Sequence, residues 1–179
     1  MQPNRLFIAA YPPLEVAQSL LEAARPTLPS NAKPVSAEQV HLTLLFIGAV
    51  RRIEVDELVE SVDRAASGRG PCRLTLNRLC VLPETGEPRL LAALGDADGN
   101  LLEIQKRLAA RLARFRPKAD RDRFLPHLTL ARFAPASPRG PDVSIEPITW
   151  NIRELRLMDS RLRPSGAIHA LVHARPLGS

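Results

Sequence analysis

The chain has 179 residues, 45% of them hydrophobic, and its 25 basic and 19 acidic side chains leave a formal net charge of +6. This composition excludes a disordered or fibrous protein, and the length fits a single domain over residues 1–179, with room for two small lobes. No apolar run approaches the ~18 to 20 residues of a membrane span, and residues 6–11 are too short for a secretory signal, so we expect a cytoplasmic protein. The positive charge indicates an anionic partner such as RNA or a phosphorylated substrate.

The first half of the chain alternates strand-like and helix-like segments. Apolar residues at strand spacing predict strands over residues 5–11, 40–48, 72–82 and 89–96. In residues 14–28 and 55–66 the apolar side chains recur at helical spacing, and Pro26, Pro29 and Gly68 end these helices. A turn-rich sequence at residues 83–88 joins the last two strands.

The second half partly repeats this order. Asn100 is a suitable N-cap for a helix over residues 101–115, in which Leu101, Ile104 and Leu108 share one apolar face. Strands are predicted over residues 125–133, 148–157 and 167–174. A helix followed by a strand with the letters HLTL therefore occurs twice. We expect an α+β fold with two similar lobes, each a mostly antiparallel sheet backed by helices, with the active-site cleft between them.

The HLTL sequence occurs at residues 41–44 and again at residues 127–130. Side chains alternate between the two faces of a strand, so His41 and Thr43 share one face, as do His127 and Thr129, while the leucines share the other. The leucines are predicted to face the core, which leaves both His/Thr faces for the cleft. One such strand is most simply a strand with a polar face, but the second copy indicates two groups that act together.

Two opposed histidines suit an in-line displacement at phosphorus. With a reference pKa of ~6.5, a neutral imidazole can take a proton from attacking water while a protonated one gives a proton to the leaving oxygen. Thr43 and Thr129 can donate hydrogen bonds to the non-bridging phosphate oxygens. These groups cover the proton transfers and the charge, so the mechanism requires no metal. The alternative is a basic RNA-binding module without catalysis, in which the HLTL faces only line a groove.

The remaining histidines and the two cysteines carry no comparable pattern. Cys72 and Cys80 lie in strand-like segments and do not form the dense framework of a disulfide-rich secreted protein. A zinc site with His169 and His173 is an alternative, but the separations are not those of a usual finger or ribbon. In the sequence IHALVHA, His169 and His173 share one strand face, and we expect them to be exposed or paired. We therefore expect neither metal nor cofactor.

The paired motifs resemble those of the 2H phosphoesterase superfamily, and their surroundings are similar to its RNA 2′,3′-cyclic phosphodiesterases of the LigT/ThpR type, also described as 2′-5′ RNA ligases. The resemblance runs nearly end to end through RLFIA, VSAEQVHLTLLFIG, RFLPHLTLAR and LRLMDSRLRPSG. It implies hydrolysis of 2′,3′-cyclic phosphates at RNA ends or on nucleotides to the 2′-phosphomonoester, with reverse 2′-5′ RNA ligation as a further activity. It implies RNA or cyclic nucleotides as partners, with no membrane and no obligate protein partner.

The resemblance also implies roles for individual residues. It makes His41 the proton donor to the leaving oxygen and His127 the proton acceptor that activates water, with Thr43 and Thr129 facing the phosphate. Arg132 is a candidate for holding phosphate through paired hydrogen bonds. Strict alternation would turn Arg132 to the opposite face, so a bulge or the strand end must bring it round.

Three further substrate-binding candidates come from the same resemblance. Ser160 matches a serine of the family, although the sequence assigns it no specific role. Many relatives carry a tryptophan before the first motif strand and an acidic residue where this chain has Tyr11, so the surface that contacts the nucleobase differs here. Phe7 and Tyr11 are candidate rings for stacking on a base, and Phe7 is equally suited to the core.

Overall fold

The structure is a computed structural model that describes residues 4–115, 124–135, 137–140, 142–163 and 166–178. Its strands are β1 (Asn4–Ala10), β2 (Lys33–Pro34), β3 (Leu42–Val50), β4 (Cys72–Leu82), β5 (Leu90–Ala97), β6 (His127–Arg132), β7 (Val143–Ile152), β8 (Glu154–Arg163) and β9 (Gly166–Pro176). Its helices are α1 (Leu14–Ala24), α2 (Val55–Ala66) and α3 (Gly99–Arg111). Short 3-10 turns cover Arg25–Thr27, Ala37–Gln39, Arg52–Glu54 and Ala113–Phe115.

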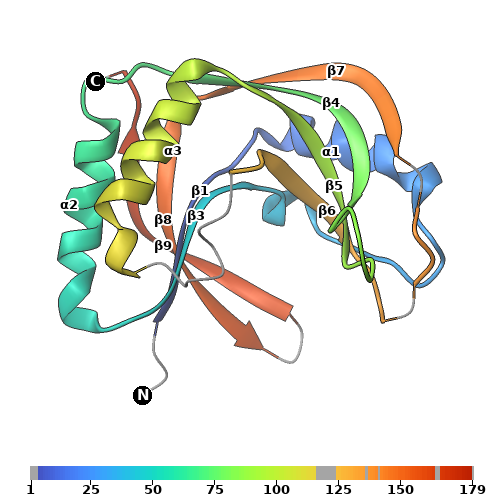
Figure 1. The fold of residues 1–179 in the computed structure, drawn as a ribbon, viewed down its shortest axis with the longest axis horizontal. Helices are drawn as coiled ribbons and strands as arrows, with labels where there is room; N and C mark the ends of the chain where they lie inside the picture. Colours follow the sequence, from blue (N-terminus) through green and yellow to red (C-terminus); the bar gives the residue numbers. More distant parts are fainter. Residues whose placement is uncertain (1–3, 116–123, 136, 141, 164–165, 179) are drawn as a thin grey trace.

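The nine strands form one antiparallel sheet in the order β7-β4-β5-β6-β3-β1-β8-β9, with β2 paired to β6 (Figure 1). The sheet consists of two similar halves, β7-β4-β5-β6 and β9-β8-β1-β3, each listed from its edge strand to the centre. The unit β1-α1-β3 of one half corresponds to the unit β5-α3-β6 of the other. The two halves join at β3 and β6, where Leu42 pairs with Leu128. The predicted α+β fold with a mostly antiparallel sheet is confirmed, and both motifs lie where the halves meet.

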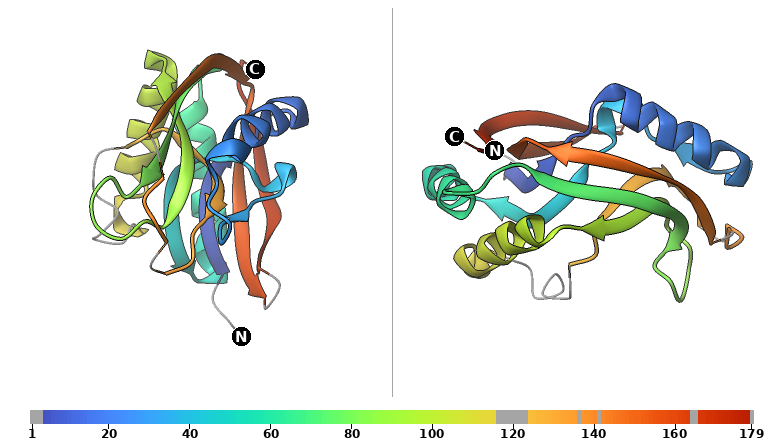
Figure 2. Two further views of the ribbon diagram at one scale, coloured as in Figure 1. Left: turned by 90° about the vertical axis from the view of Figure 1, so that its right-hand side faces the viewer. Right: turned by 90° about the horizontal axis from the view of Figure 1, so that it is seen from above.

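The helices tie the two halves together by crossing between them. Helix α1 precedes β3 in the chain but packs against β6 and β7, whereas α3 precedes β6 but packs against β3 and β4. Helix α2 lies beside α3 and also contacts β8 and β9, so α2 and α3 form a pair at one end of the molecule, away from α1 (Figures 1 and 2). Each motif strand is therefore supported by the helix that precedes the other motif strand.

One large core lies between the sheet and the helices. The four motif leucines are buried there together with apolar side chains from all three helices, for example Leu20, Leu58 and Leu108. The predicted core-facing role of the leucines is confirmed, and the histidines and threonines are left on the other face of the sheet. No helix in the described part of the chain is both long and apolar enough to cross a lipid bilayer.

Two local predictions are wrong. The segment predicted as one strand over residues 148–157 is split at Arg153, and the chain passes there from β7, at one edge of the sheet, to β8 in the other half. The N-cap of α3 is Asp98, whose side chain accepts a hydrogen bond of 2.8 Å from the Leu101 amide. Asn100 instead donates from its side chain to the Gly70 carbonyl at 2.8 Å. Helical periodicity locates the apolar face, but it does not distinguish between two capping residues this close together.

Candidate active site

The two HLTL motifs lie on directly paired strands. Because Leu42 and Leu128 are antiparallel partners, a local twofold relation places His41 near Thr129 and Thr43 near His127. All four side chains share the face opposite the core, and the two histidines are diagonal neighbours. Diagonal positions in a regular ladder lie ~7 to 8 Å apart, which leaves room for a phosphate group between two rings.

A β-bulge in β6 turns Arg132 toward the same face. Thr129 and Ala131 pair with consecutive residues of β5, so Leu130 is the extra residue of the bulge. Leu130 and Ala131 are both buried, and the alternation therefore slips by one position. Arg132 therefore lies on the same face as Thr129. The sequence alone indicated that a bulge or the strand end would be needed for this.

The same bulge occurs in β3 and identifies a residue that sequence reasoning missed. Thr43 and Leu45 pair with consecutive residues of β1, so Leu44 is the extra residue. Phe46 consequently occupies on β3 the place that Arg132 occupies on β6. The signal was present in the sequence, since HLTLLF and HLTLAR put these side chains at the same offset from their histidines.

A hydrogen bond to the backbone fixes the ring of each motif histidine. Nδ1 of His41 lies 2.7 Å from the carbonyl oxygen of Gln39, and Nδ1 of His127 lies 2.9 Å from the carbonyl oxygen of Leu125. A carbonyl oxygen can only accept, so Nδ1 carries the hydrogen in both rings. No described residue hydrogen-bonds to either Nε2, so in each ring Nε2 is the atom available for proton transfer.

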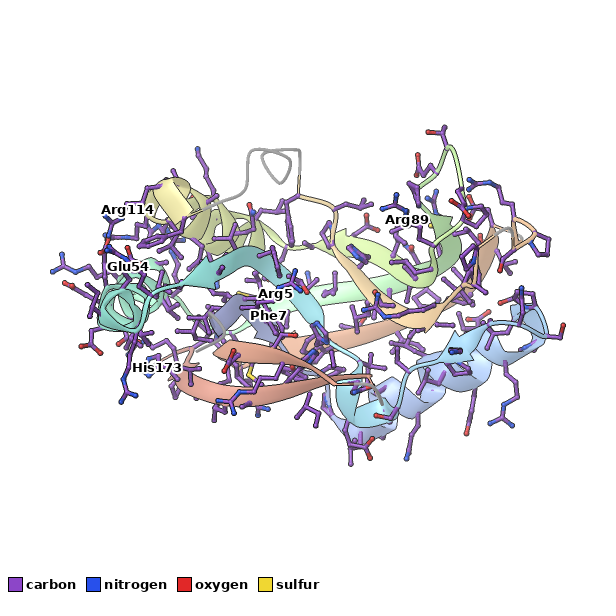
Figure 3. The ribbon with its side chains drawn as sticks, turned by 90° about the horizontal axis from the view of Figure 1, so that it is seen from below. Arg5, Phe7, Glu54, Arg89, Arg114 and His173 are labelled. Carbon is purple, nitrogen blue, oxygen red and sulfur yellow. The ribbon has the colours of Figure 1, made fainter. Side chains whose placement is uncertain are left out.

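A groove of about 640 Å³ opens over this face of the sheet. Figure 3 shows Arg5 and Phe7 near each other on β1, close to β3. The groove is lined by Arg5, Phe7, His41, Thr43, Phe46, Arg132, Ser160, Ala167 and His169. It brings together five of the predicted site residues. His127 and Thr129 lie beside it through the pairing of β6 with β3, and Tyr11 is not among the lining residues.

Aromatic rings surround His41. The ring centroids of Phe7, Tyr11 and His169 lie 5.3, 5.2 and 5.2 Å from that of His41. Phe7 is only 4% exposed, so it mainly supports the neighbouring rings. In the other half, His127 pairs with Leu94, which lies in a small cluster with Ala92 and Cys80. The two halves of the site are therefore similar in backbone but different in chemistry.

The surroundings of His41 lower the pKa of its ring. Burial is the main cause that lowers its pKa, from 6.5 to about 4. The hydrogen bond to Gln39 acts in the opposite direction, and the charges of His169, Arg132 and His127 lower the pKa further. In the free protein His41 is consequently neutral at neutral pH.

The expectation that His169 and His173 share a face is wrong. Leu171 and His173 pair with consecutive residues of β8, so Val172 is the extra residue of a bulge and the two histidines face opposite ways. His173 lies toward α2, apart from Phe7 (Figure 3), and its Nε2 is 2.8 Å from Asp63.

The cysteines do not contribute to this site. Cys72 and Cys80 are both free and buried, and burial raises the pKa of each thiol. Within the described ranges, no three His, Cys, Asp or Glu side chains are grouped so as to hold a metal ion. The zinc alternative weighed from the sequence therefore finds no support in the arrangement of these residues.

Comparison with known proteins places this arrangement among close structural relatives. The family model of the 2′-5′ RNA ligase superfamily matches residues 12–163. Among curated proteins, an RNA 2′,3′-cyclic phosphodiesterase of Thermus thermophilus is 32% identical over 176 residues, which are 94% of this chain and 87% of that protein. A protein of the same name from Archaeoglobus fulgidus is 27% identical, with 92% and 96% of the two chains covered.

Solved structures agree with these sequence matches. A crystal structure of a Thermus thermophilus protein superposes with a TM-score of 0.85 and 32% identity, covering 97% of both chains. Escherichia coli LigT in its apo form superposes with a TM-score of 0.78 and 25% identity, covering 100% of both chains. LigT has also been crystallised with 3′-AMP, and that structure superposes with a TM-score of 0.76. The similarity thus extends over the whole fold, including both motif strands.

Proposed function

Since the chain belongs to the 2′-5′ RNA ligase superfamily, we propose that it hydrolyses 2′,3′-cyclic phosphodiesters of RNA ends or nucleotides to the 2′-phosphomonoester. The names of the curated relatives support this substrate class. The observation that carries the proposal is the pair of histidines on β3 and β6. In each ring Nδ1 is hydrogen-bonded to the backbone carbonyl two residues earlier, no described residue bonds to Nε2, and the two strands are directly paired.

In the proposed reaction, the two rings act in opposite protonation states. Neutral His127 takes a proton on Nε2 from the water whose oxygen attacks phosphorus. The bond between phosphorus and the 3′ oxygen breaks, and that oxygen takes a proton from Nε2 of His41. The product carries the phosphate on the 2′ oxygen, and the reverse sequence of steps joins ends through a 2′-5′ bond. Thr43 and Thr129 donate hydrogen bonds to the non-bridging oxygens as charge develops.

The remaining groove residues are proposed to contact either the phosphate or the nucleobase of the substrate. Arg132 is exposed at the groove and can form paired hydrogen bonds with phosphate oxygens. Ser160 lies in register with Arg5 on β1 and with His169 on β9, which positions its hydroxyl for a further polar contact with substrate. Phe46 presents a partly exposed ring at the same offset as Arg132 and is our candidate for stacking on the nucleobase.

Replacing Phe46 with Leu tests whether the Phe46 ring stacks on the nucleobase. Because stacking on an aromatic ring is worth ~1 to 3 kcal/mol per base, KM for 2′,3′-cyclic AMP should rise by about tenfold or more. Leucine retains apolar packing, and inorganic phosphate lacks a base, so the inhibition constant of phosphate should stay unchanged. Equal losses for both ligands would show that Phe46 shapes the phosphate site rather than the base site.

The activity itself is tested by incubating the purified protein with 2′,3′-cyclic AMP and with an RNA oligomer that ends in a 2′,3′-cyclic phosphate. We expect turnover of both, with 2′-AMP rather than 3′-AMP as the mononucleotide product by ³¹P NMR. A 3′-phosphate product would contradict the bond cleavage proposed above. RNA binding without turnover would favour the alternative of a non-catalytic RNA-binding module.

Hydrolysis should survive exhaustive dialysis against EDTA. Two imidazoles, two hydroxyls and an arginine supply the proton transfers and the charge stabilisation, so a metal ion has no necessary task in this mechanism. The measurement is the rate before and after chelation, with Zn²⁺, Mg²⁺ or Mn²⁺ then added back. Activity that disappears on chelation and returns with a metal ion would falsify the two-histidine mechanism.

A further inference from the structure

A third histidine, His169, lies in the groove and has no task in the two-histidine mechanism. Its ring meets that of His41 edge to face at 5.2 Å and that of Phe7 at 4.9 Å. It lines the same groove as Thr43 and Arg132. Because β9 pairs with β8, the position of His169 depends on strand pairing and not on either HLTL motif.

Tyr11 is hydrogen-bonded to the His169 ring. The Tyr11 hydroxyl lies 3.1 Å from Nδ1 of His169. Burial raises the pKa of Tyr11 to about 12, despite the opposing charge of Arg156, so the hydroxyl keeps its proton at neutral pH. In the described part of the chain the hydroxyl has no other hydrogen-bond partner, and its proton can be donated to a bare Nδ1. With Tyr11 as the donor, the neutral ring carries its hydrogen on Nε2, which is the opposite tautomer to that of neutral His41.

The Nε2–H group of His169 is an available donor. No residue that the structure describes hydrogen-bonds to it. Among the described side chains, the buried polar atoms that lack a hydrogen-bond partner are Asp159 Oδ1 and Arg175 Nε. Nε2 of His169 also lacks a described partner but is not one of these buried atoms, so it is accessible. Burial, with a contribution from Arg132, lowers the pKa of His169, which keeps the ring neutral. A neutral donor thus faces the groove in which the proposed function places a phosphate.

We propose that His169 is a substrate-positioning histidine that donates a hydrogen bond from Nε2 to a phosphate oxygen of the substrate, and that Tyr11 fixes the tautomer required. The inference rests on the proposed function for the identity of the substrate. His169 is neutral in the free protein and is assigned no proton transfer. It holds the phosphate against His41, and its contribution is to binding.

The tautomer is tested by ¹⁵N NMR of the histidine rings in the free protein. We expect His169 to show a bare Nδ1 and a protonated Nε2, and His41 to show the reverse. Inorganic phosphate should shift the Nε2 resonance of His169. In Tyr11→Phe the other tautomer of His169 should become populated, because its partner hydroxyl is gone. A protonated Nδ1 in the wild-type protein, or no response of His169 to phosphate, would overturn the inference.

Kinetics and phosphate binding provide the second test. A hydrogen bond to a charged group is worth ~1.5 kcal/mol or more, so His169→Ala should raise KM and the Kd of inorganic phosphate about tenfold. The kcat value should change little, because the bond is present before and during the reaction. His169→Gln should recover part of the affinity, since its amide nitrogen can reach the place of Nε2.

His173→Ala is the matched control, since His173 lies on the same strand but faces Asp63 on α2. It should leave KM and the Kd of phosphate unchanged. Unchanged phosphate binding in His169→Ala, or an equal loss in both variants, would contradict a direct contact. Absence of hydrolysis in the wild-type protein would refute the proposed function, whereas the NMR and phosphate measurements would still decide the role of His169.

Discussion

Replacing either His41 or His127 with alanine is expected to lower kcat by about 10²- to 10⁴-fold while the protein stays folded. Each ring lies on the face opposite the core, and among the described residues neither Nε2 has a hydrogen-bond partner. The double variant should lose less than the product of the two single losses, because the rings act as a unit. Thr43→Ala and Thr129→Ala should cost less, about tenfold to a hundredfold, since each removes one hydrogen bond to the phosphate.

The measurement is steady-state hydrolysis of 2′,3′-cyclic AMP together with thermal unfolding of each variant. His173→Ala again serves as the control, because it removes a histidine from outside the groove. A variant at His41 or His127 that kept wild-type turnover would remove that ring from the mechanism. Asparagine at either position discriminates further, since a binding module would tolerate it and an acid-base pair would not.

The acid limb of kcat/KM is expected near pH 4. This parameter reports the free enzyme, in which burial and nearby positive charges lower the pKa of His41 to about 4. Below that pH the His41 ring is protonated in the free enzyme, the pair loses the singly protonated state that the mechanism requires, and the rate falls about tenfold per unit of pH. The limbs belong to the coupled pair, and the profile alone assigns neither limb to a single ring.

Substrate binding should move the pKa of His41 upward. A phosphodiester carries a negative charge, which favours the protonated ring and opposes the positive charge of Arg132. The acid limb of kcat should therefore lie at higher pH than that of kcat/KM. This coupling also reconciles a neutral His41 in the free protein with the donor role proposed for it, because the ring takes up its proton as the anion binds.

NMR titration of the His41 ring checks the same pKa without any assay of activity. Arg132→Gln should raise the pKa, because it removes one of the charges that lower it. Arg111→Gln is the control, since Arg111 is exposed at the end of α3 and is not among the groups that influence His41. Titration of His41 near its ordinary value of 6.5 in the free wild-type protein would contradict the predicted profile.

The same shift has a consequence for stability. The folded-state pKa of His41 is depressed below the unfolded value, so unfolding takes up a proton between about pH 6.5 and pH 4. The contribution of this residue to stability is therefore fully present above about pH 6.5 and is lost progressively as the pH falls toward 4.

The sequence by itself determined which side chains are proposed as the reacting groups and the side of the sheet on which they lie. The spacing of His41 and Thr43, repeated at His127 and Thr129, decides the faces because alternation along a strand is a local property of the backbone. Because the same alternation places the leucines on the opposite face, they could also be predicted as core residues. Helices and strands with clear periodicity were also found, although a strand end such as Arg153 and a cap such as Asp98 were not.

Only the tertiary structure decided how these groups meet. The pairing of β3 with β6 and the exchange of α1 and α3 between the halves depend on contacts between segments far apart in the chain. The bulges that present Phe46 and Arg132 are set by the register with a partner strand, which no single-strand pattern contains. The pKa of His41 and the tautomer of His169 depend on burial and on neighbours from other strands, so they exist only once the sheet has formed.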